Sequence, residues 1–288
     1  MVLAMTTPDP EAIKQREHAT WTATAPGWRK HDDLISSGVA PVAERLLELA
    51  GIGEGTRLLD LASGTGEPAL TAAKRVGSSG FVLGTDLVDD MLAFAREKAQ
   101  RDGLSNVEFR CMDAEALDVD ADSFDAATCR WGIMFMPDPV AALRRARAAL
   151  REGGRVAVAT WAEPARNPFA ALPLSIVRRY IDVPAPPPNA PGIFAFADPA
   201  RLRATLEQAG FSEIEVEELS VDMLEVDSGP AYWEVMSDLA GPITALMRQL
   251  PEDTQAQVER EIGEAADALR KGDKVVVGGV TWIASARR

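Results

Sequence analysis

A loop at a predicted strand-to-helix junction has the residue types of a ligand-binding turn. Residues 58–66 read Leu-Leu-Asp-Leu-Ala-Ser-Gly-Thr-Gly, and the apolar start indicates a buried strand. Glycines such as Gly64 and Gly66 let a backbone approach a ligand closely beneath a helix N-terminus. A tight turn that binds nothing is the alternative. The spacing favours the ligand-binding interpretation.

The charge of the residue beside this loop limits the classes of ligand that the loop could bind. Residues 64–69 match the G-x-G-x-x-A pattern, so a nicotinamide or flavin dinucleotide is one candidate. Asp60 comes just before the loop, however, and a carboxylate there would repel a pyrophosphate. A ligand with a cationic amine or sulfonium and no phosphate fits better. S-adenosylmethionine is such a ligand.

Two further acidic residues follow the next two predicted strands. Asp86 ends the second strand, where it could accept hydrogen bonds from ribose hydroxyls. Asp113 follows the third strand, where it could accept from an adenine amino group, with Met112 against the ring. Adjacent strand ends in a doubly wound sheet converge on one crevice, so the three acids support one site. Helix capping is the alternative for Asp86 and Asp113.

The elements that must position these residues alternate along the chain. The pattern predicts strands at 57–61, 81–86, 107–111, 124–130 and 155–161, and helices at 40–49, 67–76, 89–101 and 140–150. Such alternation implies a parallel sheet with right-handed crossovers. We expect the pattern to resume with a helix at 199–209, a strand near 214–219 and a terminal strand at 274–284. The Gly278-Gly279 pair in that terminal strand predicts a bulge or a close backbone approach.

At these motifs the chain resembles the class I S-adenosylmethionine-dependent methyltransferases. It is most similar to the branch with the ubiquinone/menaquinone-biosynthesis C-methyltransferases, over about residues 40–161. The family motif D-x-G-x-G-x-G stands here as residues 60–66, with Ala62 in place of the first glycine. The resemblance implies an α/β fold, namely a doubly wound, seven-stranded, mostly parallel sheet whose last strand is antiparallel, with helical cap insertions.

The resemblance also implies roles for individual residues toward S-adenosyl-L-methionine, which leaves as S-adenosyl-L-homocysteine. The residues that it places at the cofactor are Asp60, Ala62, Ser63, Gly64 and Gly66 in the loop, Asp86, Leu87 and Met91 at the ribose, Met112, Asp113 and Ala114 at the adenine, and Arg130 and Trp131 where cofactor and substrate meet.

Three segments outside the alternation could enclose an acceptor. We predict an N-terminal lid (1–37) and a cofactor-binding domain (38–288) with cap insertions at about 164–197 and 229–271. The apolar candidates for the acceptor site are Trp21, Trp28, Met134, Phe135, Trp161, Phe194, Phe196, Tyr232 and Trp233. Each could equally be ordinary core. Together they predict a small, mostly apolar or aromatic acceptor methylated on O, N or C.

A general base would help if the acceptor is a hydroxyl or an acidic carbon. His31 is our first choice and His18 our second, because histidine serves well as a base near neutral pH and both lie in the predicted lid. Glu163 and Tyr180 are further candidates. A surface histidine without a catalytic role is the alternative for each, and some methyl transfers need no base.

Composition excludes several other classes of function. The chain has 288 residues, with 30 Lys and Arg against 44 Asp and Glu, and this net charge of −14 disfavours nucleic-acid and anionic membrane partners. Two cysteines and two histidines are too few for a Cys-rich or multi-His metal site, so we predict no metal. Residues 1–5 do not resemble a signal peptide, and we find no apolar run of about 18 residues, so we expect no membrane insertion and a cytoplasmic location.

Two alternatives to methyl transfer stay open on the sequence. One is an NAD-dependent oxidoreductase on a similar sheet, against which Asp60 and the antiparallel last strand argue. The other is a binder in which the cofactor fold survives without chemistry. The oligomeric state is not predicted.

Overall fold

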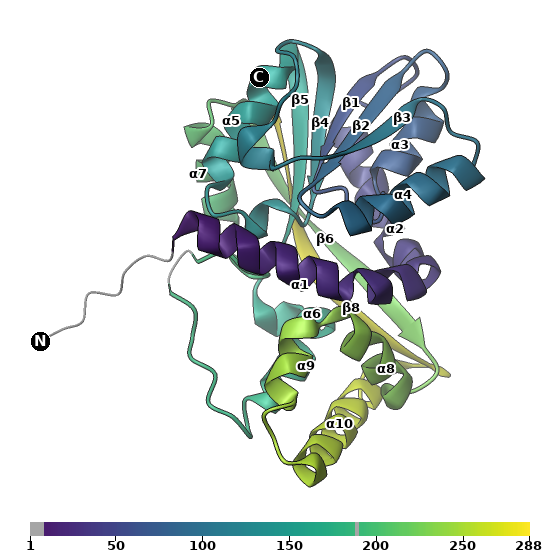
Figure 1. Cartoon of the computed structure of the whole chain (residues 1–288), viewed down its shortest axis with the longest axis vertical. Helices are drawn as coiled ribbons and strands as arrows, with labels where there is room; N and C mark the ends of the chain where they lie inside the picture. The colour runs from purple at the N-terminus through teal and green to yellow at the C-terminus, as the bar shows by residue number, and fades with distance from the viewer. Residues whose placement is uncertain (1–8, 188–189) are drawn as a thin grey trace, which may run out of the picture.

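The chain folds around one twisted α/β sheet. The computed structural model describes residues 9–187 and 190–288. The strand order is β3-β2-β1-β4-β5-β8-β6, with a short β7 beside β8. Strands β1 to β5 pair in parallel, and β8 is antiparallel to both β5 and β6 (Figure 1). This arrangement confirms the mostly parallel sheet with an antiparallel last strand.

The first four strands have the predicted bounds, and β5, β6 and β8 are longer than predicted. The short β7 was not predicted, and with it the sheet has eight strands where seven were expected. The strands are β1 (Arg57–Leu61), β2 (Phe81–Asp86), β3 (Val107–Cys111), β4 (Phe124–Arg130), β5 (Leu150–Trp161), β6 (Ser212–Val226), β7 (Arg270–Lys271) and β8 (Lys274–Arg287). Strands β6 and β8 pair along almost their whole length and reach from the sheet to the helical cap (Figure 1). The predicted irregularity at Gly278 is confirmed: the register shifts opposite it, and a Cβ there would lie 2.2 Å from the Val221 carbonyl oxygen.

The helices that follow β1, β2, β4 and the 178–197 segment agree closely with prediction. They are α3 (Ala69–Val76), α4 (Asp89–Arg101), α5 (Pro139–Ala149) and α7 (Pro199–Gln208). The short 3-10 helices are η1 (Ala114–Ala116), η2 (Ile133–Phe135) and η3 (Pro164–Arg166).

Helix α2 (Asp32–Leu49) begins eight residues before the predicted start at Ala40. Two acidic residues, Asp32 and Asp33, occupy its first turn, where the helix dipole favours negative charge. Gly38 lies inside the helix rather than before it. A Cβ at Gly38 would lie 2.1 Å from the Met223 carbonyl oxygen, so this glycine serves the close packing of α2 on β6.

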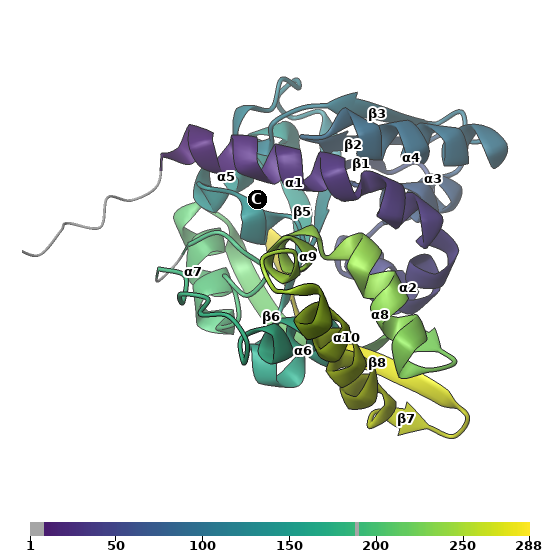
Figure 2. The ribbon, with the colours of Figure 1, turned by 60° about the horizontal axis from the view of Figure 1, so that its bottom comes forward.

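Helix α1 (Pro10–Lys30) lies in a segment where no helix was predicted. Asp9 caps its start by accepting from the Glu11 N–H, and Pro10 occupies the first turn, where a proline is tolerated. The helix crosses between the sheet and the cap, and it packs on α4, α8 and α9 (Figures 1 and 2). Residues 1–8 of the predicted lid, and with them the signal-peptide prediction, lie outside the described residues.

The cap is helical, as predicted for residues 229–271. It contains α6 (Pro168–Val177), α8 (Gly229–Leu239), α9 (Gly241–Met247) and α10 (Glu252–Asp267). Helix α10 packs on α6 and α8, and α9 packs on α6, so the two insertions form one cluster (Figure 2). In the part of the chain that the structure describes, no helix combines the length and the apolarity that a membrane span requires.

Candidate cofactor and acceptor pocket

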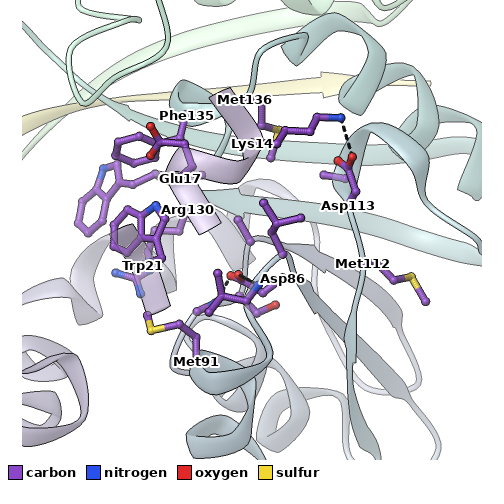
Figure 3. A pocket seen from close by; sticks show the side chains of 18 of the residues that line it. Lys14, Glu17, Trp21, Asp86, Met91, Met112, Asp113, Arg130, Phe135 and Met136 are labelled. Atoms are coloured by element: carbon purple, nitrogen blue, oxygen red, sulfur yellow. Dashed lines mark hydrogen bonds and ion pairs between the residues drawn. The ribbon is translucent and has the colours of Figure 1, made fainter. Parts of the chain in front are cut away.

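One pocket lies where β1 to β4 end and α1 crosses them. Its walls come from the first-strand loop, the ends of β2 and β3, the segment after β4, and one face of α1 (Figure 3). It is lined by Lys14, Glu17, Trp21, Trp28, Ala62, Ser63, Gly64, Thr65, Asp86, Leu87, Val88, Met91, Met112, Asp113, Ala114, Glu115, Arg130, Trp131, Gly132, Phe135, Met136 and Pro137. Most of the predicted cofactor residues therefore meet at one place.

Asp86 ties two walls of the pocket together. Its Oδ2 accepts from the Gly64 N–H at 2.8 Å, and its Oδ1 accepts from the Val88 N–H at 2.9 Å. Burial raises the pKa of this carboxyl, while the backbone hydrogen bonds act in the opposite direction. Asp86 thus orders the loop and also presents its carboxylate to the pocket, where it could accept from a diol.

Asp60 lies beneath the loop instead of on the pocket wall. Its side chain is completely buried, and Oδ1 accepts from the Thr128 hydroxyl at 2.7 Å. Its Oδ2 has no hydrogen-bond partner among the described residues. Burial raises the pKa of Asp60 to about 7. The structure therefore separates Asp60 from the residues that line the pocket.

Gly66 also lies outside the pocket lining, and packing accounts for it. Its φ is +111°, and a Cβ there would lie 2.7 Å from Leu70 Cδ1 and 3.1 Å from Ala95 Cβ. The glycine therefore lets α3 and α4 pack tightly behind the loop.

Ala62, which replaces a family glycine, is accommodated by a second glycine. Ala62 has a φ of 54°, in the left-handed region that costs a residue with a Cβ about 1 kcal/mol. A Cβ at Gly132 would lie 2.3 Å from the Ala62 methyl. Gly132 therefore provides the space for that methyl at the pocket floor.

Lys14 of α1 joins the helix to the β3 end of the pocket. Its Nζ lies 2.6 Å from Asp113 Oδ2 and 2.7 Å from Glu115 Oε2. Burial lowers the pKa of Lys14, but the hydrogen bonds to the two carboxylates outweigh it and the net shift is upward. Asp113 Oδ1 accepts from the Glu115 N–H at 2.8 Å. Asp113 thus caps the start of η1, as the capping alternative predicted, and the Asp113 carboxylate also lines the pocket.

Arg130 and Trp131 form the wall after β4. The Arg130 guanidinium donates to the Glu67 carbonyl oxygen at 3.0 and 3.2 Å and lies 5.0 Å from the Trp131 ring centre. Burial lowers the pKa of Arg130. Trp131 has a φ of 57°, which is rare for a bulky residue and concentrates at functional sites. Its indole N–H donates to the Thr281 hydroxyl at 3.0 Å, and its ring stacks on Trp161 at 4.2 Å.

Only part of the predicted acceptor set reaches the pocket. Trp21 and Trp28 come from α1 and Phe135 from η2, and the Trp21 ring contacts both of the others at centroid distances of 5.9 and 5.3 Å. The remaining candidates lie outside the lining and pack in or against the core: Met134, Trp161, Phe194, Phe196, Tyr232 and Trp233. These six residues are therefore core residues, or pack against the core, in this structure.

Neither predicted histidine lines this pocket. His31 lies at the α1–α2 junction, and its Nε2 is 2.9 Å from Asp238 Oδ2 of α8. His18 is exposed on α1. Tyr180 is hydrogen-bonded to Glu261 of α10, and Glu163 is near Arg166 and also outside the lining. None of these four side chains is among the described residues that line the pocket.

Glu115, which lines the pocket after β3, was not among the predicted site residues. Neither were two charged pocket residues of α1, Lys14 and Glu17. With Trp21 and Trp28 they recur at helical spacing, 3, 4 and 7 residues apart, so all four share one helix face. That spacing was visible in the sequence. It was overlooked because the stripe mixes charged and aromatic residues and so lacks the apolar periodicity by which helices are recognised.

The pocket residues fit S-adenosyl-L-methionine. Left-handed Gly64 brings backbone to the pocket surface, and the carboxylates of Asp86 and Asp113 line the pocket, where they could accept from a ribose diol and an adenine amine. Beneath them, Asp60 is buried with its Oδ2 unpartnered among the described residues, and a cationic ligand in the pocket would favour the ionised form of this carboxyl. No metal-binding cluster of His, Cys, Asp and Glu occurs within residues 9–187 and 190–288.

Comparisons with known proteins agree with this fit. Residues 52–175 match a family described as a methyltransferase domain. The chain is 38% identical over 127 residues to aklanonic acid methyltransferase DauC of Streptomyces sp., which covers 44% of this chain and 58% of that protein, less than two thirds of its length. It is 31% identical over 194 residues to the ubiquinone/menaquinone biosynthesis C-methyltransferase UbiE of Cronobacter sakazakii, which covers 64% of this chain and 77% of that protein.

Solved structures share the fold. The [4+2]-cyclase SpnF superimposes with a TM-score of 0.64 and 21% identity, over 96% of both chains. Phosphoethanolamine N-methyltransferase 2 of Haemonchus contortus, solved with S-adenosyl-L-methionine, gives 0.57 and 19%, over 99% of this chain and 61% of that one. Taken with the pocket, these relatives show that the chain belongs to the class I S-adenosyl-L-methionine-dependent methyltransferases of the ubiquinone/menaquinone-biosynthesis type, with S-adenosyl-L-methionine as its cofactor.

Proposed function

We propose that the chain transfers the S-adenosyl-L-methionine methyl group to a small, mostly apolar or aromatic molecule. The observation that carries this proposal is the aromatic wall of Trp21, Trp28 and Phe135, which faces the β4 end of the pocket beside Arg130 and Trp131. An apolar wall with few polar groups suits a flat organic acceptor. The names of DauC and UbiE describe methyltransferases of small organic molecules, which supports the same class.

The chain's residues would divide the work along the pocket. When bound, the cofactor supplies an electrophilic methyl group on a sulfonium. Asp86 would hold the ribose hydroxyls, and Asp113 and Met112 the adenine, as the resemblance implies. The α1 aromatics would orient the acceptor and exclude water, and such positioning can contribute several kcal/mol to the rate.

A direct assay tests the proposed acceptor class. Purified protein is incubated with methyl-labelled S-adenosyl-L-methionine and separate panels of aromatic hydroxyl compounds, phosphoethanolamine, a protein mixture and RNA. We expect label only in the aromatic panel, with Trp21→Ala reducing transfer at least tenfold because it removes the centre of the wall. Label in RNA, protein or phosphoethanolamine alone would contradict the proposal.

A further inference from the structure

We infer that Glu17 is the catalytic base of this pocket and that the acceptor is an aromatic compound methylated on a hydroxyl group. This inference rests on the proposed function and makes it more specific. It assigns a role to a carboxylate that neither the motif pattern nor the histidine candidates indicated.

Glu17 belongs to the one face of α1 that enters the pocket. Lys14, Glu17, Trp21 and Trp28 share this face, and all four line the pocket. A helix that only covered the core would place apolar side chains there. At position 17 it places a carboxylate whose side chain is only 16% exposed. Burying a carboxylate is costly, so its presence at a ligand site points to use by the ligand.

The other ionisable groups of the pocket are occupied by neighbours. Lys14 is paired with Asp113 and Glu115, and Glu115 also accepts from the Asp138 N–H. Of the remaining two groups, Asp86 accepts from the Gly64 backbone N–H, and Arg130 donates to the Glu67 carbonyl oxygen. Among the described residues, by contrast, Glu17 is bound only by side chains of its own helix: Arg16, which is 60% exposed, at 3.2 Å, and the Trp21 indole. Among the described pocket carboxylates, it is the one that does not hold the walls together.

Its place along the pocket matches the order of groups in the cofactor. Figure 3 shows Met112 and Asp113 at one end, Asp86 between, and Glu17 with Trp21 and Phe135 at the other end. In S-adenosyl-L-methionine the ribose lies between the adenine and the methyl-bearing sulfonium. If adenine and ribose lie at Asp113 and Asp86, the methyl group is directed to the end that Glu17 occupies.

The surroundings of Glu17 make it a stronger base than a surface carboxylate. Burial raises the pKa of Glu17, and the hydrogen bonds from Arg16 and Trp21 offset this only in part. The aromatic rings beside it favour contact with an apolar ring of the acceptor. The carboxylate, as a hydrogen-bond acceptor, favours a group that donates a hydrogen bond. A phenolic or enolic hydroxyl attached to a ring satisfies both requirements.

The reaction balances without any further reagent. The acceptor oxygen forms a bond to the methyl carbon, the carbon–sulfur bond breaks, and its electron pair stays on sulfur. The hydroxyl proton passes to the Glu17 carboxylate and from there directly to solvent water, which reaches this side of the helix beside the exposed Arg16 side chain. Base assistance of this kind contributes about 100-fold or more to a rate.

Binding measurements test the assignment without turnover. Calorimetry compares the wild type, Glu17→Gln and the control Glu11→Gln, which changes an exposed carboxylate on the same helix. We expect S-adenosyl-L-homocysteine to bind all three within about twofold, since Glu17 does not hold the cofactor. 4-Nitrophenol, ionised at the assay pH, is then titrated into each complex in two buffers of different ionisation enthalpy. The wild type and control should take up about one proton per site, which the phenolate and Glu17 share, and Glu17→Gln none.

Turnover gives the second readout. With 1-naphthol, whose hydroxyl must lose its proton, Glu17→Gln should be at least about 100-fold slower than the wild type, and with pre-ionised 4-nitrophenol less than about tenfold slower. Unchanged naphthol turnover, or a tenfold loss of S-adenosyl-L-homocysteine affinity in Glu17→Gln, would overturn the assignment. A wild type that binds S-adenosyl-L-homocysteine but methylates no phenol would contradict the acceptor class and leave the cofactor untouched. A wild type that does not bind it would contradict the proposed function itself.

Discussion

The two ends of the pocket are built from different parts of the chain. The end of the pocket that we propose for adenine and ribose consists of short segments directly after β1, β2 and β3, held by backbone hydrogen bonds to Asp86 and Asp113. The end proposed for the acceptor is completed by α1, which belongs to the N-terminal segment and is held through side chains such as Lys14. The carboxyl ends of the parallel strands fix the first end regardless of the acceptor. A separate helix, by contrast, can carry different side chains toward the pocket without disturbing the sheet.

Helix α1 shows the same contrast between its own two ends. Its C-terminal end and the start of α2 are joined to α4 by the Asp32–Lys98 pair, which is buried, with side chains 10% and 5% exposed. Arg29 adds a two-point contact with Glu97 at 2.6 and 3.1 Å. The N-terminal end is held by the more exposed Lys14 contacts. The following predictions test whether one end is fixed and the other can be released.

Lys98→Ala should have the largest effect. It leaves the buried Asp32 carboxylate unpaired, and breaking a buried ion pair in this way costs about 3–5 kcal/mol of unfolding free energy. Urea unfolding measures the loss. Lys74→Ala is the matched control, because its pair with Asp102 is at the surface and should be worth at most about 1 kcal/mol. Equal losses of unfolding free energy in the two variants would contradict the claim that the C-terminal end of α1 is the fixed end.

Asp60 should give the cofactor end a pH-dependent stability. Its folded pKa is about 7 and the model-compound value is 3.8, so between these values the folded chain keeps a proton that the unfolded chain releases. The free energy of unfolding should therefore fall as the pH rises through this window, by up to about 1.4 kcal/mol per pH unit. Asp60→Asn should flatten this dependence. Urea unfolding at pH 5 and pH 8 checks it, and identical slopes for the two proteins would refute the attribution.

Gly132→Ala tests the pocket floor. The new methyl would lie 2.3 Å from the Ala62 methyl, and overpacking of this kind costs about 1–3 kcal/mol. Ala62→Gly removes the obstructing methyl and also relieves the left-handed strain, so by itself it should be neutral or stabilising. The double variant should recover most of the lost stability. Additive effects in thermal unfolding would show that the two sites are independent.

Lys14→Ala should have the smallest effect on stability but should measurably change the dissociation rate of S-adenosyl-L-homocysteine. A partly exposed ion pair contributes about 0–1 kcal/mol, so thermal unfolding should hardly change. Because α1 closes over the pocket, we expect S-adenosyl-L-homocysteine to dissociate several-fold faster, as followed by the fluorescence of Trp21 and Trp28 in stopped flow. Arg16→Ala, on the exposed side of α1, is the control. Equal dissociation rates would argue against a releasable end.

The sequence located the pocket residues at the strand ends better than the pocket residues on α1, for one physical reason. Strands such as Phe81–Asp86 are buried on both faces, so they are continuous apolar runs with clear ends, and the acids after them are easily located. The pocket face of α1 must contact a ligand, so it carries Lys14 and Glu17 where a core helix carries apolar residues. The buried aromatics of the cap, such as Tyr232 and Phe196, have the same composition as an acceptor site but fill the core instead.

Calorimetric titration with S-adenosyl-L-homocysteine tests the central claim most directly, because the claim is that the ends of β1, β2 and β3 form the cofactor site. The wild type should bind with a micromolar or lower dissociation constant and should not bind NAD. Asp86→Ala should weaken binding at least tenfold, since it removes the acceptor of the Gly64 and Val88 N–H groups as well as the contact that we propose with the ribose diol. Unchanged affinity in Asp86→Ala, or binding of NAD in place of S-adenosyl-L-homocysteine, would contradict the claim.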